Sequence, residues 1–199
     1  MNHYPHFSHK RAFTLLELLV VIAIIGIMAT AGAVSLGSGS QSLQGASSIV
    51  SSIFGQARTE AIMRGTPVRV IVDTVYNSSR PDNYRRRVAL VASADGGSTW
   101  QQIGRWTLIP GQAFFNAEMS RPNGTMSLAG LPGAGSGTYG YYEFLPNGQA
   151  ASRGQVVLSA GTVVAGNFQE RSPGSRSGFF IHKLGKPTFF ADPASIPAP

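Results

Sequence analysis

The side chain whose position most needs a chemical explanation is the carboxylate of Glu17. It stands near the start of an apolar run that extends from Leu15 to Leu36. A carboxylate placed well inside a bilayer costs about 2.5–3.5 kcal/mol even on lenient insertion scales, so such a group usually has a partner and a purpose. We therefore expect Glu17 to form an ion pair rather than to face lipid alone.

The apolar run has the length of a membrane-spanning helix. Crossing roughly 30 Å of hydrocarbon takes about 20 residues at about 1.5 Å each, and backbone groups in lipid must be bonded within the segment. Lys10 and Arg11 precede the run, and no basic residue occurs from Ala12 to Phe54, which predicts a cytoplasmic N-terminus. An ordinary secretory signal has a shorter apolar stretch of about 7–15 residues, closed by a small-residue cleavage site. A plain membrane anchor explains the length but not the carboxylate.

The residues around Glu17 resemble a known processing motif. Lys10 and Arg11 are followed by Ala12 and then by Phe13-Thr14-Leu15-Leu16-Glu17-Leu18-Leu19-Val20-Val21-Ile22-Ala23-Ile24-Ile25-Gly26. This stretch is similar to the N-terminal cleavage and methylation motif of type IV pilins and type II secretion pseudopilins. The resemblance implies cleavage between Ala12 and Phe13, N-methylation of Phe13, and pairing of Glu17 with a neighbour's amine during assembly. The family usually has Gly before the cut, where this chain has Ala12.

Other groups that could carry chemistry are few. Cysteine is absent, and His3, His6 and His9 lie in the leader that the resemblance implies is removed. His182 is the one histidine beyond it, and the carboxylates show no paired spacing. We therefore expect no catalytic site, no cofactor and no metal.

The elements after the apolar run change from a helical to a strand pattern. Apolar residues recur at three- and four-residue steps over 37–66, which predicts an amphipathic helix that ends at Gly65-Thr66-Pro67. Together with the apolar run it would form one helix from Phe13 to Arg64, about 78 Å long at about 1.5 Å per residue and weakened near Gly37. Alternation then predicts strands at 68–72, 86–92, 103–108, 141–144, 155–158, 179–183 and 188–190, with a hairpin turn at Asp95-Gly96-Gly97 and mostly loop over 124–140.

Two of these stretches are similar to the GspH/FimT group of minor pseudopilins. One is the helix-to-strand junction at 57–68, and the other is the C-terminal sheet with Glu143-Phe144-Leu145-Pro146-Asn147-Gly148 and the hairpin over 178–190. The resemblance implies an α+β pilin fold, in which the long N-terminal helix packs on an antiparallel sheet. The expected segments are a leader at 1–12, the transmembrane half of the helix at 13–36, its amphipathic half at 37–66, a globular domain at 67–192 and a proline-rich tail at 193–199.

Composition agrees with a small exported β-rich domain. The 199 residues are 43% hydrophobic and 13% charged, with 24 glycines and 12 prolines, which favours short strands and many turns over an all-helical body. The net charge is +7, and loss of Lys10 and Arg11 would leave +5. We expect a single-pass inner-membrane protein with its globular domain in the periplasm.

The function expected from the resemblance is that of a structural subunit, not an enzyme. It would act as a minor pseudopilin of the type II secretion machine, with other pseudopilins, the prepilin peptidase and methylase, and inner-membrane lipid as partners. The alternative is a minor type IV pilin for pilus assembly or competence that binds DNA. Arginines near aromatic residues suit DNA binding by phosphate contact and stacking; the candidates are Arg80, Arg85, Arg86, Arg87, Arg171, Arg176, Lys183 and Lys186.

Overall fold

The computed structural model describes residues 15–16, 18–24, 39–74, 76–129, 131–132, 137–190 and 196. The chain divides into two units, Met1–Ser38 and Gly39–Pro199. In the first unit, residues 15–16 and 18–24 are helical and their large apolar side chains are exposed. Of the helices that the structure describes, none combines the length and the apolar character needed to cross a bilayer.

The second unit is built on one helix, α2 (Gly39–Arg64). Its buried positions repeat at helical spacing and form one stripe: Leu43, Ala46, Val50, Ile53, Ala57 and Ala61 are all at most 8% exposed. The helix ends where Gly65 takes a positive φ of 63°, which only glycine adopts readily, and β1 follows within four residues. The predicted amphipathic helix and its stop are confirmed.

The first sheet has the strand order β3-β2-β1-β6-β5, and each pair in it is antiparallel. Its strands are β1 (Val68–Val72), β2 (Arg87–Ser93), β3 (Trp100–Leu108), β5 (Gly124–Leu128) and β6 (Gly137–Phe144), and the short 3-10 helix η1 (Pro81–Asn83) lies between β1 and β2.

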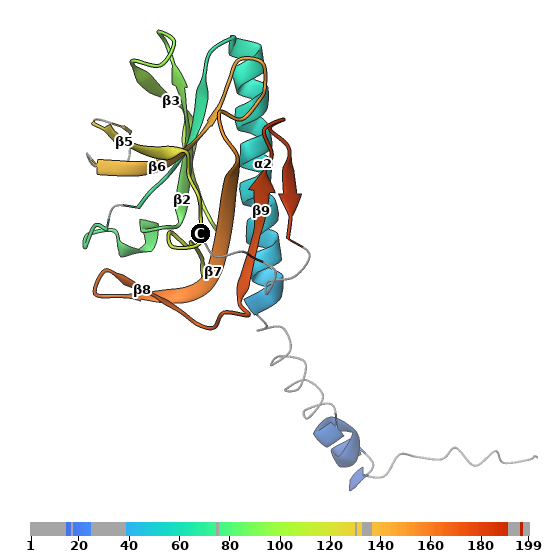
Figure 1. Ribbon diagram of the computed structural model, residues 1–199. Coiled ribbons are helices and arrows are strands. Elements are labelled where there is room, and N and C mark those ends of the chain that lie inside the picture. Colours follow the sequence, from blue (N-terminus) through green and yellow to red (C-terminus); the bar gives the residue numbers. More distant parts are fainter. Residues whose placement is uncertain are drawn as a thin grey trace, which may run out of the picture. The chain divides into compact units, whose positions relative to one another are not determined.

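The second sheet has the order β10-β9-β7-β4, with β8 paired to β7, and is antiparallel too. Its strands are β4 (Ala113–Phe115), β7 (Gly154–Val164), β8 (Asn167–Glu170), β9 (Arg176–Ile181) and β10 (Pro187–Phe189). Figure 1 shows α2 running alongside β7 and β9, with the first sheet on the other side of the domain.

Phe54 of α2 joins the helix to both sheets. Its ring makes edge-to-face contacts with Tyr142 and Phe144 of β6, at centroid distances of 5.1 and 6.2 Å, and with Phe179 of β9 at 5.2 Å. Because this ring is 1% exposed, truncating it to alanine would cost about 3–5 kcal/mol. The predicted arrangement of a helix packed on antiparallel sheet is confirmed, with two sheets around the helix.

The prediction that 124–140 is mostly loop was wrong. Residues 124–128 form β5, and β6 already begins at Gly137. Gly124 pairs with Tyr141, and a Cβ at that position would lie 3.1–3.3 Å from the tyrosine ring. Glycine at this position is therefore favoured by the close approach of the Tyr141 ring and not by a turn. The many glycines of 124–140 had wrongly suggested a loop. Two short strands, β4 and β8, were also missed.

Candidate functional site: the assembly motif and the arginine clusters

The three residues of the predicted processing and assembly site lie outside the described residues. They are Ala12, Phe13 and Glu17. Helical residues flank Glu17, at Leu15, Leu16 and 18–24, and the large apolar side chains among them are 46–82% exposed. A helix with apolar side chains exposed on all sides needs lipid or other apolar helices around it.

The face of α2 that points away from the sheets carries mostly small and polar residues. Gly45 and Gly55 have open space where a side chain would be, and Ser48, Ser52 and Thr59 are exposed between and beyond them. Three large apolar residues of α2 are also exposed, Ile49 at 40%, Ile62 at 49% and Met63 at 67%. Small residues at three- and four-residue steps let a second helix approach closely.

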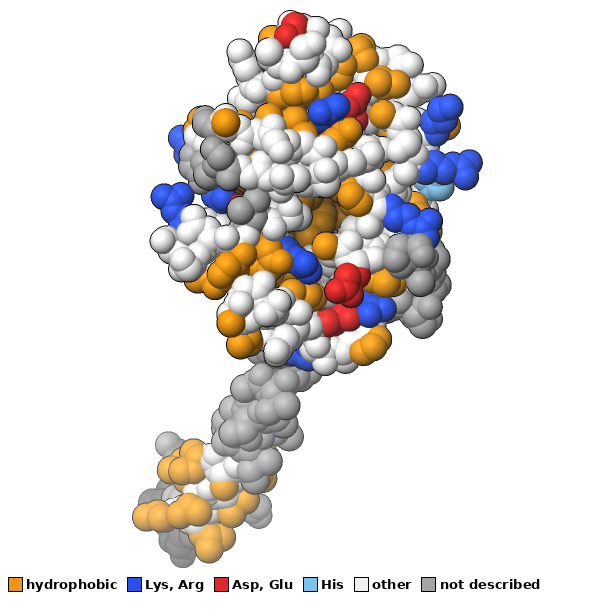
Figure 2. Space-filling view, turned by 60° about the vertical axis from the view of Figure 1, so that its left-hand side comes forward, with side chains coloured by type: hydrophobic (Ala, Val, Ile, Leu, Met, Phe, Trp, Pro, Cys, Tyr) orange, Lys and Arg blue, Asp and Glu red, His pale blue; other side chains and the backbone are white. Residues whose placement is uncertain are grey.

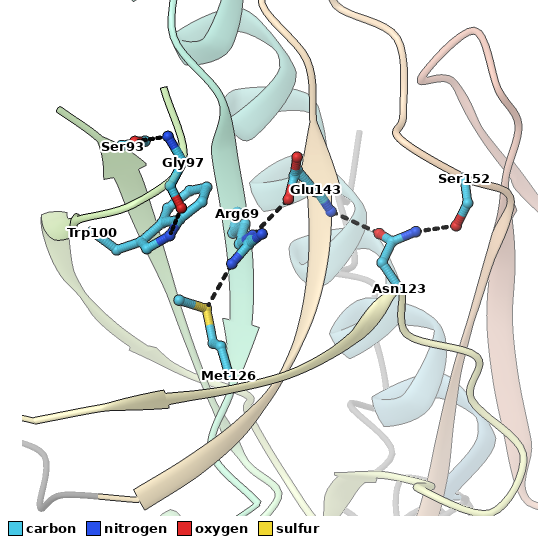
Figure 3. A network of polar contacts seen from close by, with 8 residues as sticks. All are labelled: Arg69, Ser93, Gly97, Trp100, Asn123, Met126, Glu143 and Ser152. Carbon is cyan, nitrogen blue, oxygen red and sulfur yellow. Dashed lines mark hydrogen bonds and ion pairs between the residues drawn. The ribbon is translucent and has the colours of Figure 1, made fainter. Parts of the chain in front are cut away.

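Arg69 of β1 is the centre of a polar network on the outer face of the first sheet (Figure 3). Its guanidinium carbon lies 3.9 Å from the ring centroids of both Trp100 and Tyr141, and its Nε donates to Glu143 Oε2 at 2.6 Å. Arg69 Nη1 also contacts the sulfur of Met126 at 3.7 Å. The guanidinium is therefore stacked between two aromatic rings and neutralised by a carboxylate.

The network of Figure 3 extends on both sides of Arg69. On one side, Trp100 Nε1 donates to the carbonyl of Gly97 at 3.1 Å, and Gly97 N donates to Ser93 Oγ at 2.5 Å. On the other side, Asn123 Oδ1 accepts from the backbone of Glu143 at 2.7 Å, and Asn123 Nδ2 donates to Ser152 Oγ. The pairing of Arg69 with Glu143 was not predicted from the sequence. The opposite charges of the two residues could have indicated an ion pair. Using them would have required the register of β1 and β6, which pairs Arg69 with Glu143 and was not known from the sequence.

Two arginines of the predicted DNA-binding set form ion pairs within the domain. Arg87 Nη2 donates to Asp73 Oδ2 at 2.5 Å, and its guanidinium lies 4.6 Å from the ring centroid of Trp106. Arg176 makes two bonds to Glu170, at 2.6 and 2.7 Å. The hydrogen bonds from Arg176 hold the pKa of the Glu170 carboxyl below its ordinary value and raise the pKa of the guanidinium.

The structure brings Arg85, Arg86 and Arg171 close together although they are distant in sequence. Arg86 Nη2 donates to the carbonyl oxygens of Gly111, at 2.7 Å, and Ile109, at 3.2 Å, while Arg171 Nη2 donates to Gln112 Oε1 at 2.7 Å. Arg80 is exposed in the same loop as Arg85. Lys183 and Lys186 lie elsewhere: they belong to the β9–β10 turn, where Gly185 approaches Gly148 and Arg58 near the other end of α2. The eight residues therefore do not form one continuous surface.

The Asp95 turn is the hairpin that the sequence predicted. Asp95 Oδ1 accepts from the backbone of Thr99 at 2.7 Å and of Ser98 at 2.9 Å, and these bonds hold the pKa of its carboxyl below the ordinary value.

His182 Nε2 lies 3.1 Å from Thr188 Oγ1, and both are exposed. The described residues contain no group of three potential metal ligands. Figure 2 shows hydrophobic, basic and acidic side chains intermixed on the face that it presents.

Two family models match the chain. The model of the prokaryotic N-terminal methylation motif matches residues 7–33, and that of the type II transport protein GspH matches residues 46–173, close to two thirds of the 199 residues. The chain belongs to the GspH family. It is a minor pseudopilin or minor pilin, a structural subunit that assembles with others of its kind and carries the motif that prepilin peptidase processes. The predicted membership of the GspH/FimT group is confirmed.

Solved structures with similar folds were also found. The type IV minor pilin FimU of Pseudomonas aeruginosa is 11% identical, with a TM-score of 0.45 over 78% of this chain and 92% of that one. The minor pseudopilin EpsH from the Type 2 Secretion System of Vibrio cholerae is 12% identical, with a TM-score of 0.46 over 75% of this chain and 96% of that one. No curated protein sequence matches the chain.

Proposed function

We propose that this GspH-family protein is a minor pseudopilin of a type II secretion machine and supports protein export across the outer membrane. The observation that carries the proposal is the family match over residues 46–173, joined to a methylation motif at residues 7–33. The chain would be held in the inner membrane by the helix over 13–36, with its N-terminus in the cytoplasm and its globular domain in the periplasm.

Assembly would begin with cleavage between Ala12 and Phe13 and N-methylation of Phe13. The carboxylate of Glu17 would then pair with the terminal amine of a neighbouring subunit in the apolar filament core. A carboxylate in such surroundings needs a cation, because removing one partner of a buried pair typically costs about 3–5 kcal/mol. The exposed small residues of α2 support close lateral packing of helices in the same core.

The experiment uses the full chain in its native host. Mass spectrometry of the mature protein should find an N-methylated Phe13, and Glu17→Ala should be processed and inserted but fail to enter sheared filaments. Gln101→Ala, an exposed substitution on β3 away from α2, is the control and should assemble normally. An intact Met1, or normal incorporation of Glu17→Ala, would contradict the proposal. Co-purification of the assembled subunit with secretion pseudopilins, and not with pilus subunits, is the expected result that separates the two machines.

A further inference from the structure

The end of the globular domain at which α2 begins carries a cluster of three arginines, two of which lie near aromatic rings. We name it the basal cluster: Arg85, Arg86 and Arg171, with the rings of Tyr84, Phe114 and Phe168. Its position is fixed by Gly111, whose added Cβ would lie 3.5 Å from the Cβ of Ser42 in the first turn of α2. Arg86 donates to Gly111, and Arg171 donates to the adjacent Gln112, so both arginines lie near the start of the helix.

The arginines of the basal cluster hold positive charge that no neighbouring carboxylate neutralises. Across the described ranges, none of the three forms an ion pair with Asp or Glu. The guanidinium of Arg85 lies 5.1 Å from the ring centroid of Tyr84 and 5.7 Å from that of Phe168, and Arg86 lies 5.4 Å from Phe114. Asp73, whose backbone oxygen accepts from Arg85, and Glu170, which precedes Arg171, form ion pairs with Arg87 and Arg176. Asp82, exposed in η1, is the remaining acidic group of this loop.

The backbone at Arg85 is strained to hold this arrangement. Its φ is 55°, a left-handed conformation that is costly for a residue with a long side chain. Two backbone bonds fix it, from Arg85 N to Asp73 O and from Phe115 N to Arg85 O, both at 2.8 Å. The left-handed conformation thus occurs at the residue whose guanidinium lies near the rings of Tyr84 and Phe168.

Exposed apolar side chains surround the basal cluster. Tyr76 is 40% exposed, Leu108 48% and Val164 53%. The Tyr76 ring contacts Tyr84 at a centroid distance of 5.5 Å, and Leu108 is the cross-strand partner of Arg87. Val164 precedes the β7–β8 turn, whose Gly166 packs against the Tyr76 ring. Arginine, tyrosine and exposed aliphatic residues together are the composition of surfaces that lie at a membrane–water interface.

We infer that the basal cluster binds the phosphate groups of anionic phospholipids when the subunit is anchored in the membrane, before it assembles into a filament. This rests on the proposed anchoring, since the predicted span ends at Leu36 and only Gly37 and Ser38 separate it from α2. Under that proposal, the three Cα–Cα steps from Leu36 to Gly39 span about 10 Å at most, which limits how far along the chain the start of α2 can lie from the end of the span. Guanidinium groups bind phosphate through paired hydrogen bonds, and basic residues at an anionic surface add to its attraction.

The test measures hydrogen exchange of the full chain in lipid nanodiscs. In discs that contain phosphatidylglycerol, segments 76–86, 108–116 and 164–171 should exchange on the order of tenfold more slowly than in discs of zwitterionic lipid alone, because each basic residue adds attraction to the anionic surface. The turn at 182–186, with Lys183 and Lys186, is the internal control and should not change. Arg85→Gln, Arg86→Gln and Arg171→Gln together should remove the difference, while the control variant Arg64→Gln, Arg105→Gln and Arg153→Gln, at three exposed positions, should keep it.

Further results would distinguish a loss of lipid binding from unfolding of the variant and from a failure of the proposed membrane anchoring. If the triple variant is destabilised, Arg171→Glu alone, at an exposed position, should still reduce the protection. Failure of the chain to insert into any disc would contradict the anchoring itself and overturn the inference with it. Insertion with equal exchange in both lipids would overturn the inference alone. Protection of the same segments by single-stranded DNA at physiological salt, and not by phosphatidylglycerol, would assign the cluster to nucleic acid.

Discussion

Arg69 on β1 and Glu143 on β6 are direct cross-strand partners, and the Nε of the arginine donates to the carboxylate at 2.6 Å. Both side chains are only 17% exposed, so the pair lies between the ordinary surface salt bridge and the fully buried one. The two rings that flank Arg69 exclude water from its faces and strengthen the interaction.

We expect Arg69→Ala to lower the free energy of unfolding by about 2–3 kcal/mol, since it removes the stacking and leaves Glu143 without its partner. Arg69→Lys should recover only part of the loss, because an ammonium cannot stack flat between two rings. The measurement is chemical denaturation, with Glu143→Gln and the double variant completing the cycle. Arg64→Ala, which breaks an exposed pair with Glu60 on α2, is the control and should cost only about 0.3–0.5 kcal/mol. Equal losses at both pairs would show that the stacking contributes nothing.

Gly178 of β9 should not tolerate a side chain. An added Cβ would collide with the backbone carbonyl of Val156 on β7 and would lie 2.9 Å from the Phe190 ring. Because backbone cannot move aside as a flexible side chain can, Gly178→Ala should destabilise the domain by about 2–4 kcal/mol in thermal or chemical unfolding. Gly174→Ala is the control, since its Cβ would meet nothing within 4 Å. A Gly178→Ala variant as stable as Gly174→Ala would mean that β7 and β9 are not packed at this spacing.

Most of the helices and strands could be predicted from the sequence, because the spacing of apolar residues differs between a helix and a strand. The stripe on α2 and the alternation in β1 each follow from burial on one side, so both were recognisable without a structure. Segment 124–140 was not, because its glycines suggested turns, whereas Gly124 lies in β5 close to the ring of Tyr141. The pairing of β1 with β6 joins residues some 70 positions apart, and no local pattern encodes that register.

The arginines illustrate the same limit at the candidate site. Arg85, Arg86 and Arg87 are consecutive, and the sequence analysis treated them as one basic group. In the structure Arg87 pairs with Asp73, whereas Arg86 binds the carbonyl oxygen of Gly111. Consecutive residues of a strand point to opposite faces, and the positive φ at Arg85 redirects the chain just before β2. Grouping by sequence distance therefore could not predict which arginines share a surface.

Glu170 should make the domain sensitive to acid. Its pKa is held below the ordinary value by hydrogen bonds from Arg176, so the charged carboxylate is favoured in the folded state. The stability that this contributes is present above about pH 4.5, the ordinary value for the unfolded chain, and is lost as the pH falls through the lower folded value. Glu170→Gln should reduce the steepness of acid unfolding, monitored by circular dichroism, and Arg176→Gln should do so as well. Arg153→Gln, an exposed substitution just before β7, should leave the acid transition unchanged. An acid transition of the same steepness in all three variants would contradict this role for the pair.

The residue before the predicted cut should limit the rate of processing. Ala12 stands where the pilin family usually has Gly, and its methyl group adds bulk at the bond that the peptidase must hold in an extended conformation. Ala12→Gly should therefore be cleaved faster than the natural chain, and Ala12→Val, with a branched side chain, should accumulate as precursor. Pulse-chase labelling followed by separation of precursor from mature protein measures both rates. Ser8→Gly, four residues upstream, is the control for a general gain in leader flexibility and should be cleaved at the natural rate. Equal rates for Ala12→Gly and the natural chain would mean that the peptidase of this host accepts either small residue, and cleavage of Ala12→Val at that rate would place the cut elsewhere.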